Sequence, residues 1–227
     1  MPRKPFLSIR QSIPRGGTIE IGAPSVGNRP ELEKLIANCI MVFSIAEAEM
    51  SLMLGQLLGT DNDAALAVFQ TLRRASNQRD AIAAAADSAL PNEEDQKLVT
   101  ALLDVHKSVE SDRTALAHGN FGTIDTLPEA LLWMTTKDYV HLKTRLNLRN
   151  EVLTEEIENG FYASLSYYEK PDLEAILEDT KMCAAMWPDA IQWLRAHGPS
   201  RAELFRRLAD QPRIAEALKK SRRENIQ

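Results

Sequence analysis

The sequence predicts a mainly α fold, an antiparallel helical bundle with a small antiparallel β-meander inserted before the C-terminal helices. Apolar residues recur at helical spacing through three long segments before residue 120. The joints between these segments are short, which favours antiparallel neighbours. Between residues 120 and 168, short aromatic and β-branched runs alternate with turn residues, and the helical period then returns.

The 227 residues can bury a real core, and the 26% charged and 44% hydrophobic fractions are those of an ordinary globular protein. We expect an N-terminal arm at 1–30, a single helical-bundle domain at 31–210 with its β-insertion near 120–168, and a C-terminal helix with a basic tail at 211–227. The net charge of −5 excludes a global basic field, so any RNA contact must come from local patches.

The sequence also restricts location and chemistry. No apolar run approaches a membrane span and no signal-peptide core is present, so we expect a cytoplasmic protein without a membrane partner. Cys39 and Cys183 lie in apolar helical runs and indicate buried free thiols. The four histidines are scattered, and phosphate-loop, dinucleotide and nucleophile-elbow motifs are absent from the sequence. We therefore expect no metal and no cofactor.

The first 30 residues are rich in Pro, Gly and Arg, which is typical of an arm. Within them, residues 18–21 (Thr-Ile-Glu-Ile) could form a short strand. The basic residues of this arm could contact a polyanion, or the arm could be a solvated tail. These residues are Arg3, Lys4, Arg10 and Arg15.

The first long helix is predicted over residues 31–58. Its main apolar stripe includes Leu35, Cys39 and Phe43. A second patch, formed by Met41, Ile45 and Leu52, lies on roughly the opposite face. A helix that is apolar on two faces is buried between layers or pairs with another subunit. Glu47 flanks the main stripe, either as a paired structural carboxylate or as part of a site.

A second helix is predicted over residues 61–87, and Arg79 falls inside its apolar stripe. A buried arginine without an acid is costly, so we predict that Arg79 meets Glu47 or Asp112. In a bundle these charges and Arg113 could converge into one polar network, structural or functional.

The third helix is predicted over residues 92–119, with Asn92 as its N-cap and acidic residues in its first turn. Gly119 is predicted to end it in the left-handed conformation. Asp112 and Arg113 lie within roughly 60° of the centre of the apolar stripe. Charges beside a buried stripe need partners or a functional role.

The insertion is predicted to contain strands at 121–125, 131–135 and 161–167, with turns at 125–128 and 158–160. Residues 139–148 are ambiguous between strand and helix. Helix returns near Pro171, Pro188 is expected to kink or break it, and short helices follow at 201–209 and 213–220. The basic tail contains Lys219, Lys220, Arg222 and Arg223.

The spacing of Arg113 and His118 is the sharpest feature of the chain. On an ideal helix the two side chains point about 140° apart. They could meet if the last turn of the helix loosens, or if two copies of the helix lie side by side in a dimer.

Residues 112–119, Asp-Arg-Thr-Ala-Leu-Ala-His-Gly, resemble the R-x(4–6)-H signature of HEPN-like proteins. These are small helical bundles, and many act as metal-independent endoribonucleases. Catalytic members usually carry Asn, His or Asp after the arginine, and Thr114 stands there in this chain. About 0.3 matches to the bare pattern are expected by chance, and the helical placement strengthens this one.

The resemblance implies a homodimer whose two-fold arrangement places two motifs in one cleft. It also implies an RNA substrate and a toxin or defence role. His118 would act as general acid or base, and Arg113 would stabilise charge on the phosphoryl oxygens. Asp112 or Glu47 would orient these groups, with Thr114 and Arg79 as supporting residues.

Two alternatives remain. The chain could be a non-catalytic HEPN-like module that dimerises or binds a protein or nucleotide, which Thr114 and the acidic net charge favour. Alternatively, Arg113 could be a structural ion in a helical scaffold, with His118 serving the helix end. A histidine before a C-terminal glycine favours the helix dipole, and His197 precedes Gly198 in the same way. His106, two turns before Arg113, is expected to be a hydrogen-bonded core histidine, or else a member of the site.

Overall fold

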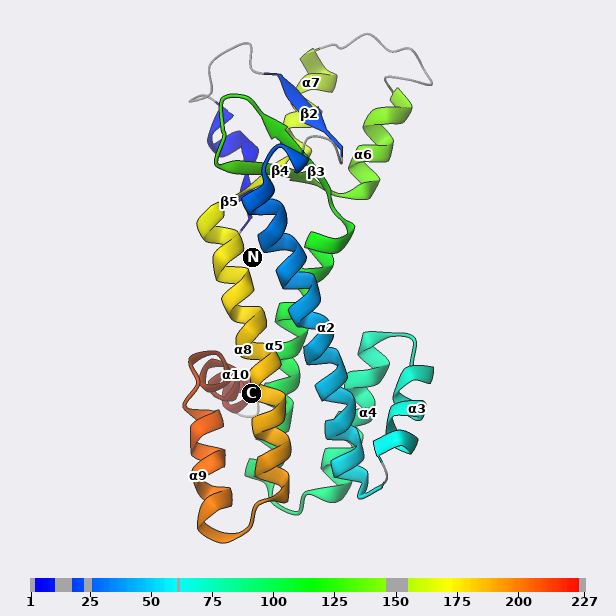
Figure 1. Ribbon diagram of the computed structural model, residues 1–227, viewed down its shortest axis with the longest axis vertical. Coiled ribbons are helices and arrows are strands. Elements are labelled where there is room, and N and C mark those ends of the chain that lie inside the picture. Colours follow the sequence, from blue (N-terminus) through cyan, green and yellow to red (C-terminus); the bar gives the residue numbers. More distant parts are fainter. Residues whose placement is uncertain (1–2, 11–17, 23–25, 61, 146–154, 225–227) are drawn as a thin grey trace. The chain divides into compact units, whose positions relative to one another are not determined.

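The computed structural model describes residues 3–10, 18–22, 26–60, 62–145 and 155–224. It confirms a mainly α fold with a small antiparallel sheet (Figure 1). The chain divides into two compact units. We call Met1–Ile40 with Ser111–Glu178 the sheet unit, and Met41–Glu110 with Asp179–Gln227 the helical unit. The division falls within α2 (Pro30–Leu58), α5 (Glu93–His118) and α8 (Lys170–Arg195).

The sheet unit contains a five-stranded antiparallel sheet with strand order β1-β5-β4-β3-β2. Its strands are β1 (Lys4–Pro5), β2 (Ile19–Ile21), β3 (Asn120–Ile124), β4 (Ala130–Met134) and β5 (Ser166–Glu169). β3, β4 and β5 form the predicted meander. Both edge strands come from the N-terminal segment that was expected to be an arm, since β1 pairs with β5 and β2 pairs with β3.

An apolar cluster packs around this sheet. Its buried members are Phe6, Ile124, Ala130, Leu132, Met134, Leu165 and Tyr167. Phe6 lies in the 3-10 turn η1 (Phe6–Ser8) and is 1% exposed. Its backbone N–H donates to the carbonyl of Leu165 over 3.0 Å. The segment after β1 is therefore fixed to the sheet by burial and by a backbone hydrogen bond.

The predicted third strand and its preceding turn were placed incorrectly. Helix α7 (Glu155–Ser164) covers the expected turn at 158–160 and the first part of the expected strand, and β5 begins only at Ser166. Phe161 and Tyr162 pack on the sheet cluster from this helix. An aromatic run of this kind is compatible with a helix or a strand, and packing against the sheet cluster selects the helix.

The ambiguous segment at 139–148 is helical where it is described. Helix α6 (Thr136–Lys143) begins after Thr135, whose Oγ1 accepts a hydrogen bond of 3.1 Å from the backbone N–H of Asp138. This is an N-cap of the usual type. Residues 146–154 lie outside the described residues, as does Arg15.

The helical unit contains the larger apolar core, built on Phe43, Met50, Leu98, Leu102 and Trp187 among others. One long helix at 61–87 was predicted, but the structure has two, α3 (Asn62–Thr71) and α4 (Ala75–Ala89). The break occurs where Arg74 adopts an extended backbone (φ −107°, ψ 131°). Neither glycine nor proline stands at the break, so the sequence carries no local signal for it.

The expected break at Pro188 is also absent, because α8 runs from Lys170 to Arg195 with this proline inside it. Trp187 and Ala190 on either side are fully buried. Their packing outweighs the loss of one backbone hydrogen bond. The predicted terminal helices are confirmed as α9 (Gly198–Ala209) and α10 (Pro212–Glu224), and the expected basic tail falls within α10.

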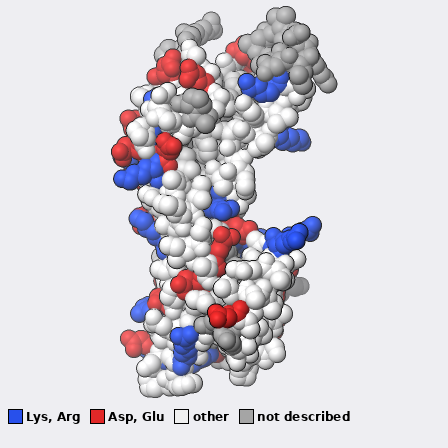
Figure 2. Space-filling view, turned by 45° about the vertical axis from the view of Figure 1, so that its right-hand side comes forward, with Lys and Arg blue, Asp and Glu red and all other residues white. Residues whose placement is uncertain are grey.

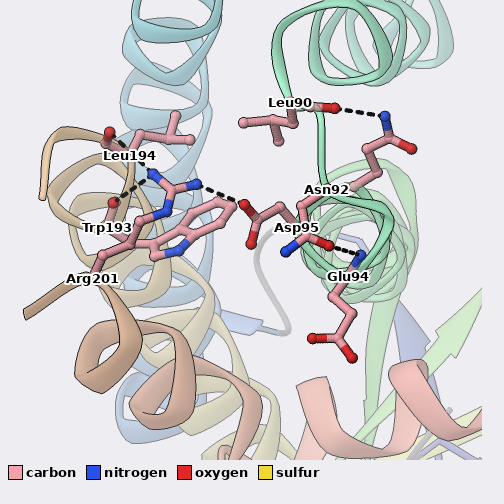
Figure 3. Close-up of polar contacts among 8 residues, drawn as sticks. Leu90, Asn92, Glu94, Asp95, Trp193, Leu194 and Arg201 are labelled. Atoms are coloured by element: carbon pink, nitrogen blue, oxygen red, sulfur yellow. Dashed lines mark hydrogen bonds and ion pairs between the residues drawn. The ribbon is translucent and has the colours of Figure 1, made fainter. Parts of the chain in front are cut away.

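The start of α5 is capped and tied to the end of α8 (Figure 3). The side-chain oxygen of Asn92 accepts a 2.9 Å hydrogen bond from the backbone N–H of Glu94, which confirms the predicted cap. Arg201 of α9 donates to the Asp95 carboxylate over 2.8 Å and to the Trp193 carbonyl over 3.3 Å. Its guanidinium also lies 4.7 Å from the centre of the Trp193 ring. One arginine therefore joins the first turn of α5 to the last turns of α8.

Helix α2 exposes part of its second apolar patch. In the helical unit Met41 is 60% exposed and Ile45 is 55% exposed. The helix is long and apolar enough to cross a membrane by length and composition, with a mean hydropathy of 1.5 over an 18-residue window of which 33% is buried. This corrects the expectation that no apolar run approaches a membrane span. Core helices of soluble proteins meet the same criteria.

Charges of both signs are interspersed on the face drawn in Figure 2. This distribution agrees with the modest net charge of −5. An anionic ligand would therefore depend on a few local cations.

Candidate functional site

The C-terminal end of α5 carries the predicted site, and this end is a regular helix. Helix α5 continues to His118, and the backbone N–H of Gly119 donates to the carbonyl of Ala115 over 3.0 Å. The last turn therefore does not loosen. Arg113 and His118 remain about 140° apart on one copy of the helix. Of the two ways in which they were expected to meet, only a second copy remains.

The predicted residues of this helix end differ in burial. His118 and Thr114 are exposed, whereas Asp112 and Arg113 are half-buried. Both half-buried charges are engaged in interactions. Each charge beside the apolar stripe therefore has at least one interaction, while the His118 imidazole is open to solvent.

The strand β4 fixes the last turn of α5 through Trp133. Its indole Nε1–H donates to the carbonyl of Ala115 over 2.9 Å. A Cβ at Gly119 would lie 1.8 Å from that nitrogen, so only glycine leaves room for the indole. Gly119 was expected to be left-handed, but it is not among the glycines with positive φ. The glycine of the His-Gly pair is thus required by close packing and not by backbone conformation.

A second contact caps the same helix end. The hydroxyl of Thr136, at the start of α6, donates to the carbonyl of His118 over 2.8 Å. The side-chain amide of Asn120 in turn donates to this hydroxyl over 3.2 Å. The His118 carbonyl, which the helix itself leaves unsatisfied, is thus bound by a side chain from α6. The Ala115 carbonyl accepts from Trp133 of β4 as well as from the backbone N–H of Gly119. The backbone that carries His118 is held on two sides.

Tyr168 of β5 joins the half-buried side of the motif to the N-terminal segment. The residue is 2% exposed, and burial raises the pKa of its phenol to about 12. The Arg3 guanidinium hydrogen-bonds the phenol and lowers this pKa, whereas the Asp112 carboxylate raises it. Arg3 and Asp112 therefore act on the same phenol from segments that are distant in sequence.

The four charges that were expected to converge are divided between the two units. Asp112 and Arg113 belong to the sheet unit, and Glu47 and Arg79 belong to the helical unit. The expectation that Arg79 finds a carboxylate is confirmed, but that carboxylate belongs to Glu110, where Glu47 or Asp112 had been predicted. Glu47 is half-buried and has an interaction of its own.

His106 is a core histidine, as expected. It is 1% exposed, and its Nδ1 accepts a hydrogen bond of 3.2 Å from the indole Nε1 of Trp187. The Cys183 sulfur lies 3.6 Å from the same nitrogen, and Phe43 lies against the ring with centroids 5.0 Å apart. Burial first, and then the charge of Arg79, lower the pKa of His106 to about 4. A neutral, enclosed imidazole serves packing, and His106 does not belong to the site.

Cys39 and Cys183 are both free and buried, as predicted. Burial raises the pKa of the Cys183 thiol to about 12. The thiol beside His106 therefore lacks the thiolate character of a catalytic cysteine.

Sequence patterns did not indicate Trp133, Thr136, Tyr168 or Arg3 as neighbours of the motif. Their placement depends on the strand register, in which Trp133 pairs with Ser166 and Lys4 pairs with Tyr167. Among the described residues, no group of three or more His, Cys, Asp or Glu side chains could hold a metal ion. Comparisons with protein-family models, curated proteins and solved structures found no match for this chain.

Proposed function

We propose that this chain is a metal-independent endoribonuclease that acts as a homodimer through Arg113 and His118. The observation that carries the proposal is the exposed imidazole of His118 on a firmly held helix end, five residues from the half-buried Arg113. An exposed imidazole is available for proton transfer, and its rigid backbone favours a fixed geometry.

The proposed reaction uses the substrate's own nucleophile. His118 takes the proton of a ribose 2′-hydroxyl, whose oxygen then attacks the adjacent phosphorus. The bond from phosphorus to the 5′-oxygen breaks, the leaving oxygen takes a proton from water, and a 2′,3′-cyclic phosphate and a 5′-hydroxyl result. The His118 imidazolium then returns its proton to the solvent. Arg113 hydrogen-bonds the non-bridging oxygens, where charge develops. A second subunit supplies the Arg113 that helix geometry keeps away from His118 of the same chain.

Of the four supporting residues, Asp112 and Thr114 belong to the sheet unit, and Glu47 and Arg79 belong to the helical unit. The Asp112 carboxylate acts electrostatically on the Tyr168 phenol, and we assign it the role of orienting the half-buried side of the motif. Thr114 is exposed on the same helix end and offers a hydroxyl to a bound nucleotide. Glu47 and Arg79 belong to the helical unit, and we assign them no catalytic step.

The test is cleavage of single-stranded RNA by the full chain in EDTA. Arg113→Ala and His118→Ala should each abolish cleavage, and Arg113→Lys should lose most of it because lysine cannot form the bidentate contact. His141→Ala is the matched control, because His141 is another exposed histidine of the sheet unit. Circular dichroism should show an unchanged helical signal in every variant. Undiminished cleavage in both alanine variants would defeat the proposal.

A second candidate is a non-catalytic module for dimerisation or for binding a protein or nucleotide. Close packing against Trp133 accounts for Gly119 without any catalytic role. The exposed Met41 and Ile45 of α2 suit a subunit contact. Wild-type protein that forms dimers but leaves RNA intact in chelator would favour this module. Analytical ultracentrifugation of a Met41→Glu/Ile45→Glu variant then tests whether this surface forms the dimer. The variant should sediment as a monomer.

A further inference from the structure

The side chain of Arg3 lies beside the end of α5, although Arg3 and Arg113 are 110 positions apart in the sequence. Its guanidinium carbon is 4.1 Å from the centre of the Trp133 ring, a cation–π distance. The next two residues form β1, which pairs with β5 in the register Lys4 with Tyr167 and Pro5 with Ser166. Sheet pairing therefore fixes the backbone that carries Arg3.

The ring beneath Arg3 is the one that holds the motif helix. The Trp133 indole binds the Ala115 carbonyl, and Gly119 makes room for it next to His118. Arg3 also hydrogen-bonds Tyr168, the phenol on which the Asp112 charge acts. Arg3 is thus connected through Trp133 to the His118 end of the motif and through Tyr168 to the Asp112 end.

Two other cations near the start of the N-terminal segment, Lys4 and Arg10, pair with carboxylates. Lys4 pairs with Glu169 over 2.5 Å and with Asp172 over 3.1 Å. Arg10 lies 3.6 Å from Glu158 and donates to Asn159 over 2.9 Å. The charges of these two residues are thus engaged by carboxylates.

Arg3 differs because the partners described for it are the uncharged rings of Trp133 and Tyr168. Stacking uses the face of a guanidinium and leaves its five N–H donors at the edge. The Tyr168 phenol oxygen accepts a hydrogen bond from one of these donors. The half-exposed Arg3 therefore retains both its charge and donors that can reach a phosphate.

We propose that Arg3, held over Trp133 by β1, is a phosphate-binding residue of the RNA site at the C-terminal end of α5. This proposal rests on the proposed function, because RNA is the ligand of that site. Arg3 touches the substrate backbone and takes no part in proton transfer. It adds one phosphate contact to those made around Arg113.

The experiment measures binding without cleavage. Full-length protein with a C-terminal tag is titrated into a fluorescent single-stranded RNA whose 2′-hydroxyls are methylated, so that it cannot be cleaved. Anisotropy gives Kd over a series of salt concentrations for wild type, Arg3→Gln, Arg3→Lys and Lys4→Gln. Glutamine keeps an apolar stem and a donor for Tyr168 but removes the charge, and Lys4→Gln is the matched control for loss of an N-terminal charge.

Arg3→Gln should weaken binding several-fold. It should also reduce the magnitude of the slope of log association constant against log salt concentration by about 0.7, the value for one phosphate contact on a single strand. Arg3→Lys should restore the slope, and Lys4→Gln should leave it unchanged. A wild-type slope in Arg3→Gln would overturn the proposal even if its Kd rose, because a purely structural effect does not remove a counterion-releasing contact. Absence of any wild-type binding would overturn it as well.

The two proposals fail in distinguishable ways. Wild-type protein that binds the methylated RNA but never cleaves ordinary RNA would sink the nuclease proposal and leave the Arg3 slope as a valid test. Cleavage that depends on Arg113 and His118, together with an unchanged salt slope in Arg3→Gln, would support the nuclease proposal. It would contradict the phosphate-binding role of Arg3.

Discussion

The Trp133 indole donates a 2.9 Å hydrogen bond to the Ala115 carbonyl, and the close approach that this requires leaves no space for a side chain at Gly119. This contact joins β4 to the last turn of α5. The helix end that carries His118 is consequently positioned by the sheet, and a change at residue 119 should be felt by the whole sheet unit.

Gly119→Ala should therefore destabilise the protein. The added Cβ would fall 1.8 Å from the indole nitrogen, so the ring must move and its hydrogen bond is strained. Overpacking of this kind costs about 1 to 3 kcal/mol in the free energy of unfolding. Urea denaturation followed by circular dichroism measures it.

Gly160→Ala is the control for this substitution. Nothing lies within 4 Å of a Cβ at Gly160, which is inside α7. Alanine there should stabilise the helix by up to about 1 kcal/mol. Equal unfolding free energies for the two variants would contradict the role assigned to Trp133.

Removing Arg201 should cost much more stability than removing Arg207. The side chains of Arg201 and its partner Asp95 are 28% and 13% exposed, whereas those of Arg207 and its partner Asp189 are 54% and 27% exposed. Arg201→Ala leaves a nearly buried carboxylate without its cation, at a cost of about 3 kcal/mol. Arg207→Ala should cost less than about 1 kcal/mol. The measurement is chemical denaturation of both variants in one buffer, and similar midpoints would argue against the tie between α5 and α8.

His106 should make stability depend on pH. Its pKa is about 4 in the folded protein and near 6.5 when unfolded, so between these values the unfolded chain binds more protons. Stability from this group is complete above pH 6.5 and is lost as pH falls toward 4, at up to about 1.4 kcal/mol per pH unit. Unfolding free energies measured at several pH values should show this slope in wild type.

His106→Asn provides the comparison. Asparagine keeps an acceptor for Trp187 but does not titrate, so the slope between pH 4 and 6.5 should decrease even if the variant is less stable throughout. A slope identical to that of wild type would show that other groups cause the acid sensitivity.

Both cysteines should resist a thiol reagent in the native state. Cys39 and Cys183 are buried, and burial raises the pKa of the Cys183 thiol to about 12. Little Cys183 thiolate is therefore present at neutral pH, and burial shields both sulfur atoms from the reagent. Reaction with a disulfide reagent should label both thiols only after urea is added. Rapid labelling of folded protein would mean that the packing around the labelled cysteine opens readily.

Local signals predicted much of the fold. Asn92 and the apolar period located α5, and the run of turn residues after Ile124 located the β3–β4 hairpin. These features depend on residues that are neighbours in the chain. The continuity of α8 through Pro188 was missed because packing around Trp187 and Ala190 decided it, and the break at Arg74 was missed because neither glycine nor proline marks it in the sequence.

Only the residues of the candidate site that lie on one helix could be predicted from the sequence. Spacing indicated Arg113 and His118, and the cost of burying a charge indicated that Arg79 needs an acid. The identity of the carboxylate that pairs with Arg79 depended on how α4 packs against α5, so the sequence did not predict Glu110.

The sequence by itself therefore determined the long helices α2 and α5, the Asn92 cap, the buried thiols and the position of the motif, because each follows from periodicity or from the chemistry of adjacent residues. Only the tertiary structure decided that the N-terminal segment forms both edges of the sheet, that Trp133 requires Gly119, and that Arg3 lies at the end of α5. Strand pairing brings together residues more than a hundred positions apart, and no local pattern records such a register.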